Sequence, residues 1–558
     1  MSGASNFLSR IFARLAQEKD VIVLRELRDE KIVSANGPEL LSLTAQARAF
    51  IARQGLKKGD RCALLAPNSI RWVAMDIALM AEGMIVVPLY ARQEPSELVT
   101  MMKDCTPSLV CCGDAVLRDG ILKVWAEAPT QCLFDEVFGE NSPGDAEPDP
   151  AAIPTLLASD PVTIIYTSGT SGEAKGVILN AGNVTHMLDC TSGRLDSLME
   201  KQSGNDRVFH YLPFCFAGSW VMMLTCLLRG NLLTLNTDLS KLANEMRNAS
   251  PDYFLNVPAL LERMRKAVDE QLWKTGGIVH NIYSRAKSAW MRENEGKSSF
   301  ADSVWLRIAR SVIFPTIRKK MIGGNLKALI CGSAPLNLET QLYFCMLGIP
   351  VLQVYGLTET TAICTMDDPE RVVPGRVGPA ISGVEMKLGE AGEIIVRGPN
   401  IFPGYWNRPE ETAKTMREGW FHTGDQGEVD ATGNWHIVGR IKNLIILGSG
   451  HNIAPEPVED KILRSLPEAQ QVMIVGNGRG YLSAIVTGKV AREAAQAALD
   501  KVNSEIPHYK QVRAFSIQEE PFSIDNGLLT ANGKLKRDLI TQRFRSEIED
   551  LYRQKQAS

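Results

Sequence analysis

Apolar positions along the first three quarters of the chain alternate between strand-like runs and helix-like spacing. Residues 61–65 and 84–88 are short apolar runs, and residues 70–83 between them have apolar positions at helical period. The alternation resumes with the strand-like run 162–166 and continues to about residue 439. Strands that alternate with helices are typical of parallel sheets covered by helices, so we predict an α/β fold for this part.

After Gly439 the pattern changes. Strand-like runs at residues 444–447, 471–475 and 481–487 alternate with charged helical segments. They predict a small α+β domain of about 110–120 residues, which is an ordinary domain size. We therefore divide the chain into a large domain, residues 1–439, and a small domain, residues 440–558.

Three further segments have patterns of their own. An amphipathic helix that we expect to pack on its own domain is indicated by Phe7, Leu8, Ile11, Phe12 and Leu15. Residues 139–154 are rich in Gly, Pro, Asp and Glu, and we expect a surface connection there. Residues 261–320 are helical in pattern and basic, which fits either a solvated helical face or a surface that faces a membrane or CoA.

Composition narrows the class of protein. The 558 residues are 45% apolar and 22% charged, with a net charge of −3, which is typical of globular proteins and gives no support to nucleic-acid binding. Eleven cysteines without CxxC spacing predict free thiols in a reducing compartment, so we expect a cytoplasmic protein. We expect no membrane-spanning helix, which would need about 20 apolar residues in a row.

The strongest local signal is the sequence YTSGTSGEAK at residues 166–175, which follows an apolar strand. Glycines let backbone N–H groups approach a phosphate, and the hydroxyls and Lys175 add donors and positive charge. The loop is not a Walker A sequence, which would place Gly directly before the lysine and Ser or Thr after it. The loop therefore disfavours kinase-type or GTPase-type chemistry.

Five more motifs follow in order: CGSAPL at 331–336, QVYGLTET at 353–360, GWFHTGD at 419–425, GRIKN at 439–443 and NGLLTANGKLKR at 526–537. Together with the loop they resemble the adenylate-forming superfamily, which contains acyl-CoA synthetases, adenylation domains and luciferases. The resemblance covers nearly the whole chain. It implies a large α/β domain with flanked sheets and a small barrel near residues 375–439, capped by a small mobile α+β domain.

The resemblance assigns roles around ATP. Tyr355 would stack on adenine, Asp425 would accept both ribose hydroxyls, and Arg440 would contact the same ribose. Glu359 and Thr170 would hold Mg²⁺, because a carboxylate beside a polyphosphate is repelled unless a cation lies between them. The predicted ATP- and AMP-binding residues are Thr167, Ser168, Gly169, Thr170, Ser171, Lys175, Gly332, Ser333, Ala334, Gln353, Tyr355, Gly356, Thr358, Asp425 and Arg440.

Two lysines of the small domain match functional positions of the superfamily. Lys534 matches the catalytic lysine, and with Thr358 and Glu359 it completes the predicted catalytic residues. A carboxylate that attacks the α-phosphate of ATP meets a second anion, and a lysine between them offsets the repulsion. Lys442 matches the hinge about which the small domain swings.

Within the superfamily the chain looks most like long-chain fatty acyl-CoA synthetases. The resemblance rests on NGLLTxxxKLKR, the helical insert before residue 326, and GSGHNIAP at 448–455. It assigns Gly448, Ser449 and Gly450 to the CoA tunnel, and Phe214, Phe216 and Trp220 to the acyl pocket. Many relatives have histidine in place of Phe216 and an acid in place of Asn443; packing is the alternative interpretation for Phe216 and Trp220.

Three functions stay open at this point. The first is a ligase that uses ATP, Mg²⁺ and CoA to convert a long- or medium-chain fatty acid into its CoA thioester. The second is an acyl-AMP ligase that loads an acyl-carrier protein; such relatives often have an insertion after the hinge, and none is evident between Lys442 and Glu459. The third, a nucleotide- or lipid-binding protein without turnover, is disfavoured because the functional lysines and acids are present. The sequence leaves the acyl chain length, homodimer formation and peripheral membrane contact undecided.

Overall fold

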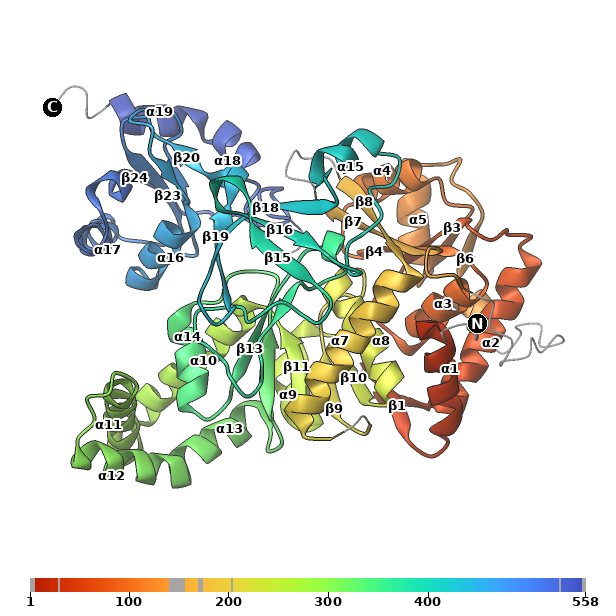
Figure 1. Ribbon diagram of the computed structural model, residues 1–558, viewed down its shortest axis with the longest axis horizontal. Coiled ribbons are helices and arrows are strands. Elements are labelled where there is room, and N and C mark those ends of the chain that lie inside the picture. Colours follow the sequence, from red (N-terminus) through yellow and green to blue (C-terminus); the bar gives the residue numbers. More distant parts are fainter. Residues whose placement is uncertain are drawn as a thin grey trace.

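The computed structural model describes residues 6–28, 31–139, 156–168, 174–201, 204–530 and 533–553. Two sheets form the centre of the large domain (Figure 1). Both sheets are parallel except at the edge strands β2, β8 and β14. The eight-stranded sheet has the order β14 (Thr365–Met366), β13 (Val351–Tyr355), β12 (Ala328–Cys331), β11 (Tyr253–Asn256), β9 (Arg207–His210), β10 (Leu232–Asn236), β1 (Ile22–Arg28) and β2 (Lys31–Asn36). The six-stranded sheet has the order β6 (Gln131–Leu133), β5 (Leu109–Cys112), β3 (Arg61–Leu65), β4 (Ile85–Leu89), β7 (Pro161–Ser168) and β8 (Ala174–Asn180).

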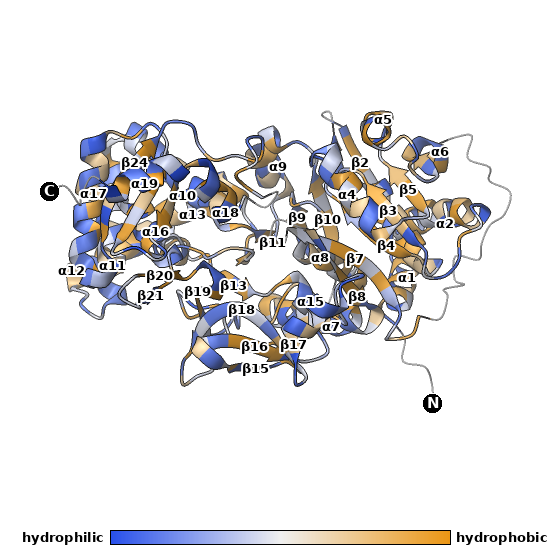
Figure 2. Ribbon diagram, turned by 90° about the horizontal axis from the view of Figure 1, so that it is seen from above, coloured by the Kyte–Doolittle hydropathy of each residue, from blue (hydrophilic) through white to orange (hydrophobic). Residues whose placement is uncertain are grey.

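Side chains along each strand point alternately to two hydrophobic cores. In β3, Cys62 and Leu64 join the core between the sheets, whereas Ala63 and Leu65 join a core on the outer face. This period of two is the reason that strands buried on both faces are apolar throughout. Figure 2 shows these strands in the hydrophobic colours.

Helices fill the space between the sheets and cover their outer faces. The shared core contains residues of α1 (Phe7–Gln17), α2 (Gly37–Arg53), α3 (Ile70–Ala81), α6 (Phe134–Phe138), α7 (Ala181–Met199) and α8 (Ala217–Arg229). The outer cores contain residues of α4 (Pro95–Cys105) and α5 (Ala115–Val124) on one side, and of α9 (Leu242–Ala249), α10 (Pro258–Thr275), α13 (Phe314–Ile322) and α14 (Leu338–Met346) on the other. In α3 every residue except Arg71 is buried, as expected of a helix enclosed on all sides.

Several local predictions are confirmed. The predicted strand 61–65 is β3, and the predicted helix 70–83 is α3, which ends two residues early because Gly83 turns the chain at φ 76°. The five apolar residues of the N-terminal helix are all buried on their own domain. All eleven cysteines are free, and most are buried. The predicted surface connection, residues 139–154, lies outside the described residues except for Gly139.

A five-stranded antiparallel sheet follows the two large sheets. It contains β15 (Glu385–Leu388), β16 (Glu393–Arg397), β17 (Met416–Arg417), β18 (Trp420–Val429) and β19 (Trp435–Arg440), and α15 (Pro409–Thr415) precedes β17. Among the described strands the pairings leave this sheet open, whereas the sequence led us to expect a small barrel here.

The last part of the chain has hydrophobic cores of its own. Their residues lie between Ile445 and Tyr552, and none comes from the layered sheets. The strands are β20 (Ile445–Ile446), β21 (Asn452–Ile453), β22 (Gln471–Val475), β23 (Leu482–Thr487) and β24 (Val512–Gln518), and the helices are α16 (Glu456–Ser465), α17 (Arg492–Glu505), α18 (Arg537–Arg543) and α19 (Arg545–Arg553). In the described part of the chain no helix has both the length and the apolar character that crossing a membrane requires.

Candidate active site

A buried carboxylate lies where the eight-stranded sheet meets the small antiparallel sheet. Asp425 on β18 is only 4% exposed and lies opposite Arg440 on β19 in the strand register. Its Oδ1 is 2.6 Å from Arg440 Nε, and its Oδ2 accepts a 2.8 Å hydrogen bond from the hydroxyl of Tyr355 at the end of β13. Burial raises the pKa of Asp425, while Arg440 and Tyr355 oppose that rise. Three predicted ribose and adenine residues are thus brought together and held rigidly.

Glu359 lies in the short helical turn Thr358–Thr360, directly after β13. Its Oε1 accepts a 2.8 Å hydrogen bond from the hydroxyl of Tyr405. Burial and the charge of Glu359 raise the pKa of Tyr405, so the hydroxyl stays protonated and can donate. The turn needs Gly356, because a Cβ there would lie 2.3 Å from the carbonyl oxygen of Ala362.

Lys175 at the start of β8 is held by an acid that the sequence did not indicate. Its Nζ lies 2.6 Å from Glu411 Oε2 on α15 and 5.4 Å from the centre of the Tyr405 ring. Lys175 and then Lys414 lower the pKa of Glu411 to about 2, so this acid is ionised at neutral pH. Thr167 Oγ1 lies 3.5 Å from the backbone oxygen of Lys175.

Part of the predicted phosphate loop cannot be placed. Gly169, Thr170 and Ser171 lie outside the described residues, and so does the side chain of Ser168. The roles predicted for these residues stay predictions. The described ends of the loop, Thr167 and Lys175, are paired in the hairpin of β7 and β8.

Lys534 reaches this group from the small domain. Lys534 is an exposed residue, but the protein atoms around its amine lower the pKa of that amine, Arg440 lowers it further, and the carboxylates of Asp425 and Glu359 raise it. The amine therefore lies close enough to feel the charges of residues more than 100 positions earlier in the chain. The backbone N–H of Thr530 donates to the Lys534 carbonyl oxygen at 2.8 Å, and the Lys534 N–H donates to Thr530 Oγ1 at 3.1 Å. Nearby, Lys536 Nζ approaches Glu97 Oε1 of α4 to 3.9 Å, which places the small domain against the large one.

Other residues predicted to bind the nucleotide lie in the loop after β12 or in an internal hydrogen-bond network. Ser333 and Ala334 are exposed in the loop after β12, and Gly332 packs on Val354 of the neighbouring strand. The amide of Gln353 donates to Gln341 and to the Arg376 backbone, so it belongs to an internal network.

The residues predicted for the hinge and the tunnel lie at the start of the small domain. Lys442 is in the turn Ile441–Asn443, and burial followed by the charge of Arg440 lowers its pKa to about 8. Exposed residues between β20 and β21 include Gly448, Ser449 and Gly450. Their assignment to a CoA tunnel stays a prediction.

The predicted acyl-pocket aromatics are divided between interior and surface. Trp220 is fully buried, and its Nε1 donates a 2.9 Å hydrogen bond to the buried Asp76. Phe214 is buried between His210 and Trp72, whereas Phe216 is half-buried beside Tyr90. Packing therefore accounts for the observed positions of Trp220 and Phe214, and their role toward an acyl chain stays a prediction.

Sequence reasoning missed Tyr405 and Glu411. Both lie in or beside the segment GYWNRPEETAK at residues 404–414, where an aromatic residue and a run of acids precede a short helix. Acidic residues are common at the start of a helix, where they interact favourably with the helix dipole. The sequence of this segment therefore did not indicate that Glu411 pairs with Lys175.

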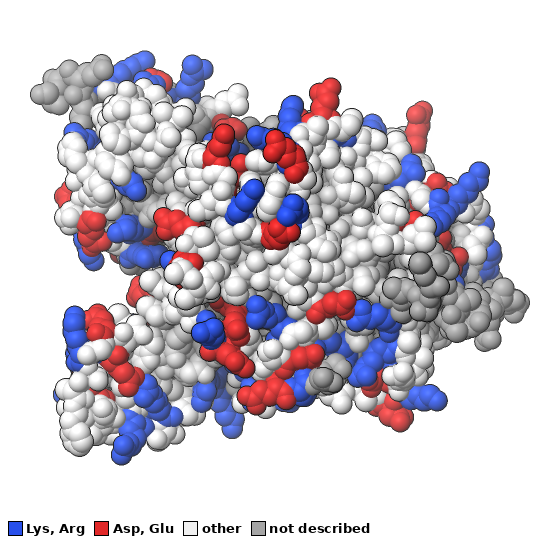
Figure 3. All heavy atoms as spheres, in the orientation of Figure 1, with Lys and Arg blue, Asp and Glu red and all other residues white. Residues whose placement is uncertain are grey.

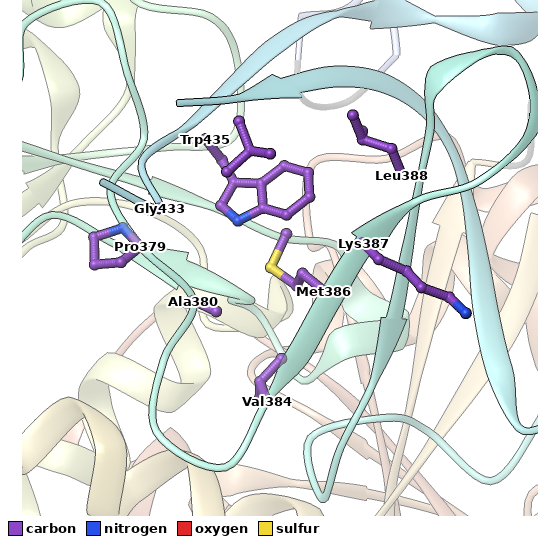
Figure 4. Close-up of a pocket in the computed structure, with 9 residues that line it drawn as sticks. Pro379, Ala380, Val384, Met386, Lys387, Leu388, Gly433 and Trp435 are labelled. Carbon is purple, nitrogen blue, oxygen red and sulfur yellow. The ribbon is translucent and has the colours of Figure 1, made fainter. Parts of the chain in front are cut away.

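A hollow of about 620 Å³ lies away from this cluster, in the small antiparallel sheet. Figure 4 shows Met386, Leu388 and Trp435 around it. None of the predicted site residues lines it, so we do not assign it to the active site.

The structure thus combines a buried cluster of a carboxylate, a guanidinium and a tyrosine hydroxyl with a lysine loop of the C-terminal domain whose amine is influenced by the same carboxylate. The AMP-binding enzyme family matches residues 16–406, and the AMP-binding enzyme C-terminal domain matches residues 442–556. The chain belongs to the AMP-binding enzyme family.

Its relatives are distant but span the whole chain. The long-chain-fatty-acid–CoA ligase FadD15 of Mycobacterium bovis is 24% identical, over 98% of this chain and 97% of that protein. The long-chain-fatty-acid–CoA ligase ACSBG1 of Homo sapiens is 25% identical, over 96% of this chain and 83% of that protein. The crystal structure of the adenylation domain of a carboxylate reductase from Mycobacterium chelonae superposes with a TM-score of 0.77 at 20% identity, over 99% of this chain and 92% of that one.

Proposed function

We propose that the protein is an AMP-forming fatty acid:CoA ligase that activates a long- or medium-chain fatty acid as acyl-AMP and transfers the acyl group to CoA. The observation that supports the proposal is the buried cluster of Tyr355, Asp425 and Arg440, with the loop of Lys534 near enough for the charges of Asp425 and Glu359 to influence its amine. The curated relatives named as long-chain-fatty-acid–CoA ligases support the choice of acid and acceptor.

In the first step a carboxylate oxygen of the fatty acid attacks the α-phosphorus of ATP, and pyrophosphate leaves. Asp425 holds the ribose, since a carboxylate can accept two vicinal hydroxyls at once. Lys175 faces the phosphates. The protonated amine of Lys534 lies between the two anions and stabilises the charge that develops on the transferring phosphoryl group.

In the second step the CoA sulfur, as its thiolate, attacks the carbonyl carbon of the acyl-AMP, the C–O bond to the phosphate breaks, and AMP leaves. We propose that the small domain, residues 440–558, rotates about Lys442 between the steps. The rotation would withdraw Lys534 and bring the exposed residues Gly448–Gly450 to the thiol. Small residues there leave room for a thin pantetheine chain beside the backbone.

The residues present fit a Mg²⁺ ion beside the phosphates. One oxygen of Glu359 accepts from Tyr405, and the other has no hydrogen-bond partner among the described residues. The described residues contain no group of three or more His, Cys, Asp or Glu that could hold a metal on their own. Mg²⁺ commonly binds through one or two carboxylates together with substrate phosphates, and bound there it would neutralise the charge of the triphosphate.

The test is a substrate panel. Purified protein receives ATP, Mg²⁺, fatty acids of increasing length and either CoA or an acyl-carrier protein, and AMP, pyrophosphate and thioester are measured. We expect AMP and acyl-CoA in equal amounts. Transfer to the carrier protein without acyl-CoA would contradict the acceptor, and absence of pyrophosphate with every acid would contradict the enzyme assignment.

A further inference from the structure

The helices between β11 and β12 form an arm that carries exposed apolar side chains away from the active site. The arm contains α10, α11 (Gly277–Asn294), α12 (Phe300–Ile308), a π-turn (Ala309–Ile313) and α13. Eight of the 22 large apolar side chains that are exposed in the described residues lie between Trp273 and Val312. Single exposed apolar residues are ordinary, but such a concentration indicates an interaction surface.

Four of the eight recur at every fourth position: Phe300, Val304, Ile308 and Val312, with exposed fractions of 88%, 43%, 39% and 59%. Residues four apart lie on one face of a helix. We call these four residues the apolar stripe. In an α-helix each step of four drifts by about 40° around the axis. The wider π-turn at Ala309–Ile313 counters this drift in the last step, so Val312 lies closer to the direction of Ile308 than an unbroken α-helix would place it.

The opposite face of this helix is already occupied. Leu306, Ala309 and Ile313 are buried in the core of the arm, and Arg292 of α11 pairs with Asp302 of α12. The apolar stripe is therefore the outward face of a firmly anchored helix. In Figure 1 the arm extends from the body below the C-terminal domain, and Figure 3 shows it as a separate lobe with Lys and Arg side chains among Asp and Glu side chains on its face.

The same helical face continues into a basic hollow. The next positions at this spacing are Thr316 and Lys320, and both line a depression of about 540 Å³. The other residues that line it are Asn244, Arg247, Asn248 and Lys319. In the described structure the three basic residues form no ion pair within 4.0 Å, so their charge is free to meet an anion. We call this depression the basic hollow.

The charge around the arm is mainly positive. Residues 258–322 contain thirteen Lys and Arg against six Asp and Glu, in a chain whose net charge is −3. Helices with an apolar face and a Lys- and Arg-rich polar face bind at the surface of membranes that contain anionic lipids.

We propose that the apolar stripe and the basic hollow dock the protein on an anionic phospholipid bilayer. The stripe enters the boundary between headgroups and acyl chains, and the hollow receives a lipid phosphate. The positive charge favours an anionic bilayer over a second copy of the chain as the binding partner, because the basic surfaces of two copies would repel each other. This inference goes beyond the acyl transfer proposed above and does not depend on it.

The test is co-sedimentation of the full chain with vesicles, without ATP or CoA. Vesicles of phosphatidylcholine with 30% phosphatidylglycerol, about one lipid in three, are compared with pure phosphatidylcholine vesicles. We expect binding to the anionic vesicles that weakens with salt, and at least about tenfold weaker binding to the neutral ones. Equal binding to both, or no binding, would overturn the proposal.

Matched variants locate the surface. Phe300→Ser with Ile308→Ser should reduce the partition coefficient about tenfold, because the apolar contact is lost. Val116→Ser with Leu122→Ser, which changes two exposed apolar residues of α5, should leave it unchanged. Lys319→Glu with Lys320→Glu should abolish the preference for phosphatidylglycerol, whereas Lys57→Glu with Lys123→Glu should not. Thermal melts check that each variant is folded.

Sedimentation velocity tests the alternative that a second copy of the chain covers the apolar stripe. A wild-type dimer that the stripe variant converts to a monomer, without vesicle binding by either protein, would show that a second copy covers the stripe and would overturn the proposal. Equal vesicle binding by the stripe variant and the α5 variant would overturn it as well.

Discussion

The two sides of the active site are built differently. On the large-domain side two charged groups have fixed partners: Asp425 has Tyr355 and Arg440, which lies at the domain boundary, and Lys175 has Glu411. On the small domain Lys534 forms no ion pair within 4.0 Å among the described residues, although its amine lies in the field of two carboxylates. One side therefore has paired charges, whereas the lysine on the other side has no ion-pair partner among the described residues.

The difference has a physical origin. Apart from Glu411 on α15, the fixed groups lie on strands of three sheets, whose backbone hydrogen bonds set their positions. Lys534 lies on a loop of a domain with separate hydrophobic cores, which touches the large domain through contacts such as Lys536 with Glu97. Relative motion is the usual expectation for domains with separate cores. Substitutions on the two sides should therefore damage different half-reactions.

The largest effect is expected for Lys534→Ala. Adenylation should fall about 10³-fold, or about 4 kcal/mol, because the charge that joins the two anions is lost. Thioester formation from supplied acyl-AMP should be nearly unchanged. Pyrophosphate release and acyl-CoA formation are measured separately. Equal loss in both steps would mean that Lys534 supports the fold instead of the chemistry.

The reverse pattern is expected for Lys442→Pro. Proline fixes φ near −65°, so rotation at the hinge should be blocked and thioester formation should fall about 10²-fold, while adenylation persists. Lys442→Ala is the control, because it removes the charge and leaves the backbone free. If alanine were as damaging as proline, the amine and not the hinge motion would be required.

The pH dependence of adenylation should show the lowered pKa of Lys534. The amine acts in its protonated form, so kcat/KM should fall with rising pH at a value below the ordinary lysine pKa of about 10.4. Lys534→Arg should remove this alkaline limb from the residual activity, because arginine stays charged. Lys442 also has a lowered pKa, so Lys442→Arg is the control and should keep the limb. An unchanged limb in Lys534→Arg would assign it to another group.

Local sequence patterns predicted the helices and strands but not which distant residues contact each other. The alternation of apolar residues located β3, α3 and β4 to within two residues, because the period of burial is a property of a single segment. Lys175 and Glu411 are 236 residues apart, and Tyr405 and Glu359 are 46 apart. No periodicity links such positions, since it is the packing of sheets that brings them together.

The basic helical segment, residues 261–320, also shows what a local pattern can and cannot predict. Its pattern indicated helices and positive charge, and both are confirmed. The direction of Val312 relative to Ile308 depends on a π-turn at Ala309–Ile313, which has no sequence signal that we recognised. The motifs predicted more. Tyr355, Asp425 and Arg440 were named from the resemblance, and in the structure Asp425 accepts a hydrogen bond from Tyr355 and forms an ion pair with Arg440.

The smallest expected effect tests how the ion pair with Glu411 influences Lys175. The Lys175–Glu411 pair is partly exposed, with 23% and 32% of the two side chains accessible, so we expect it to contribute only about 0.5–1 kcal/mol. Glu411→Gln releases Lys175 for the phosphates of ATP and should lower the KM for ATP about two- to fivefold, with kcat unchanged. Glu410→Gln on the same helix is the control and should change neither constant. A higher KM for ATP in Glu411→Gln would mean that the acid orients Lys175 toward the nucleotide, and that preorganisation on this side outweighs the competition for the lysine.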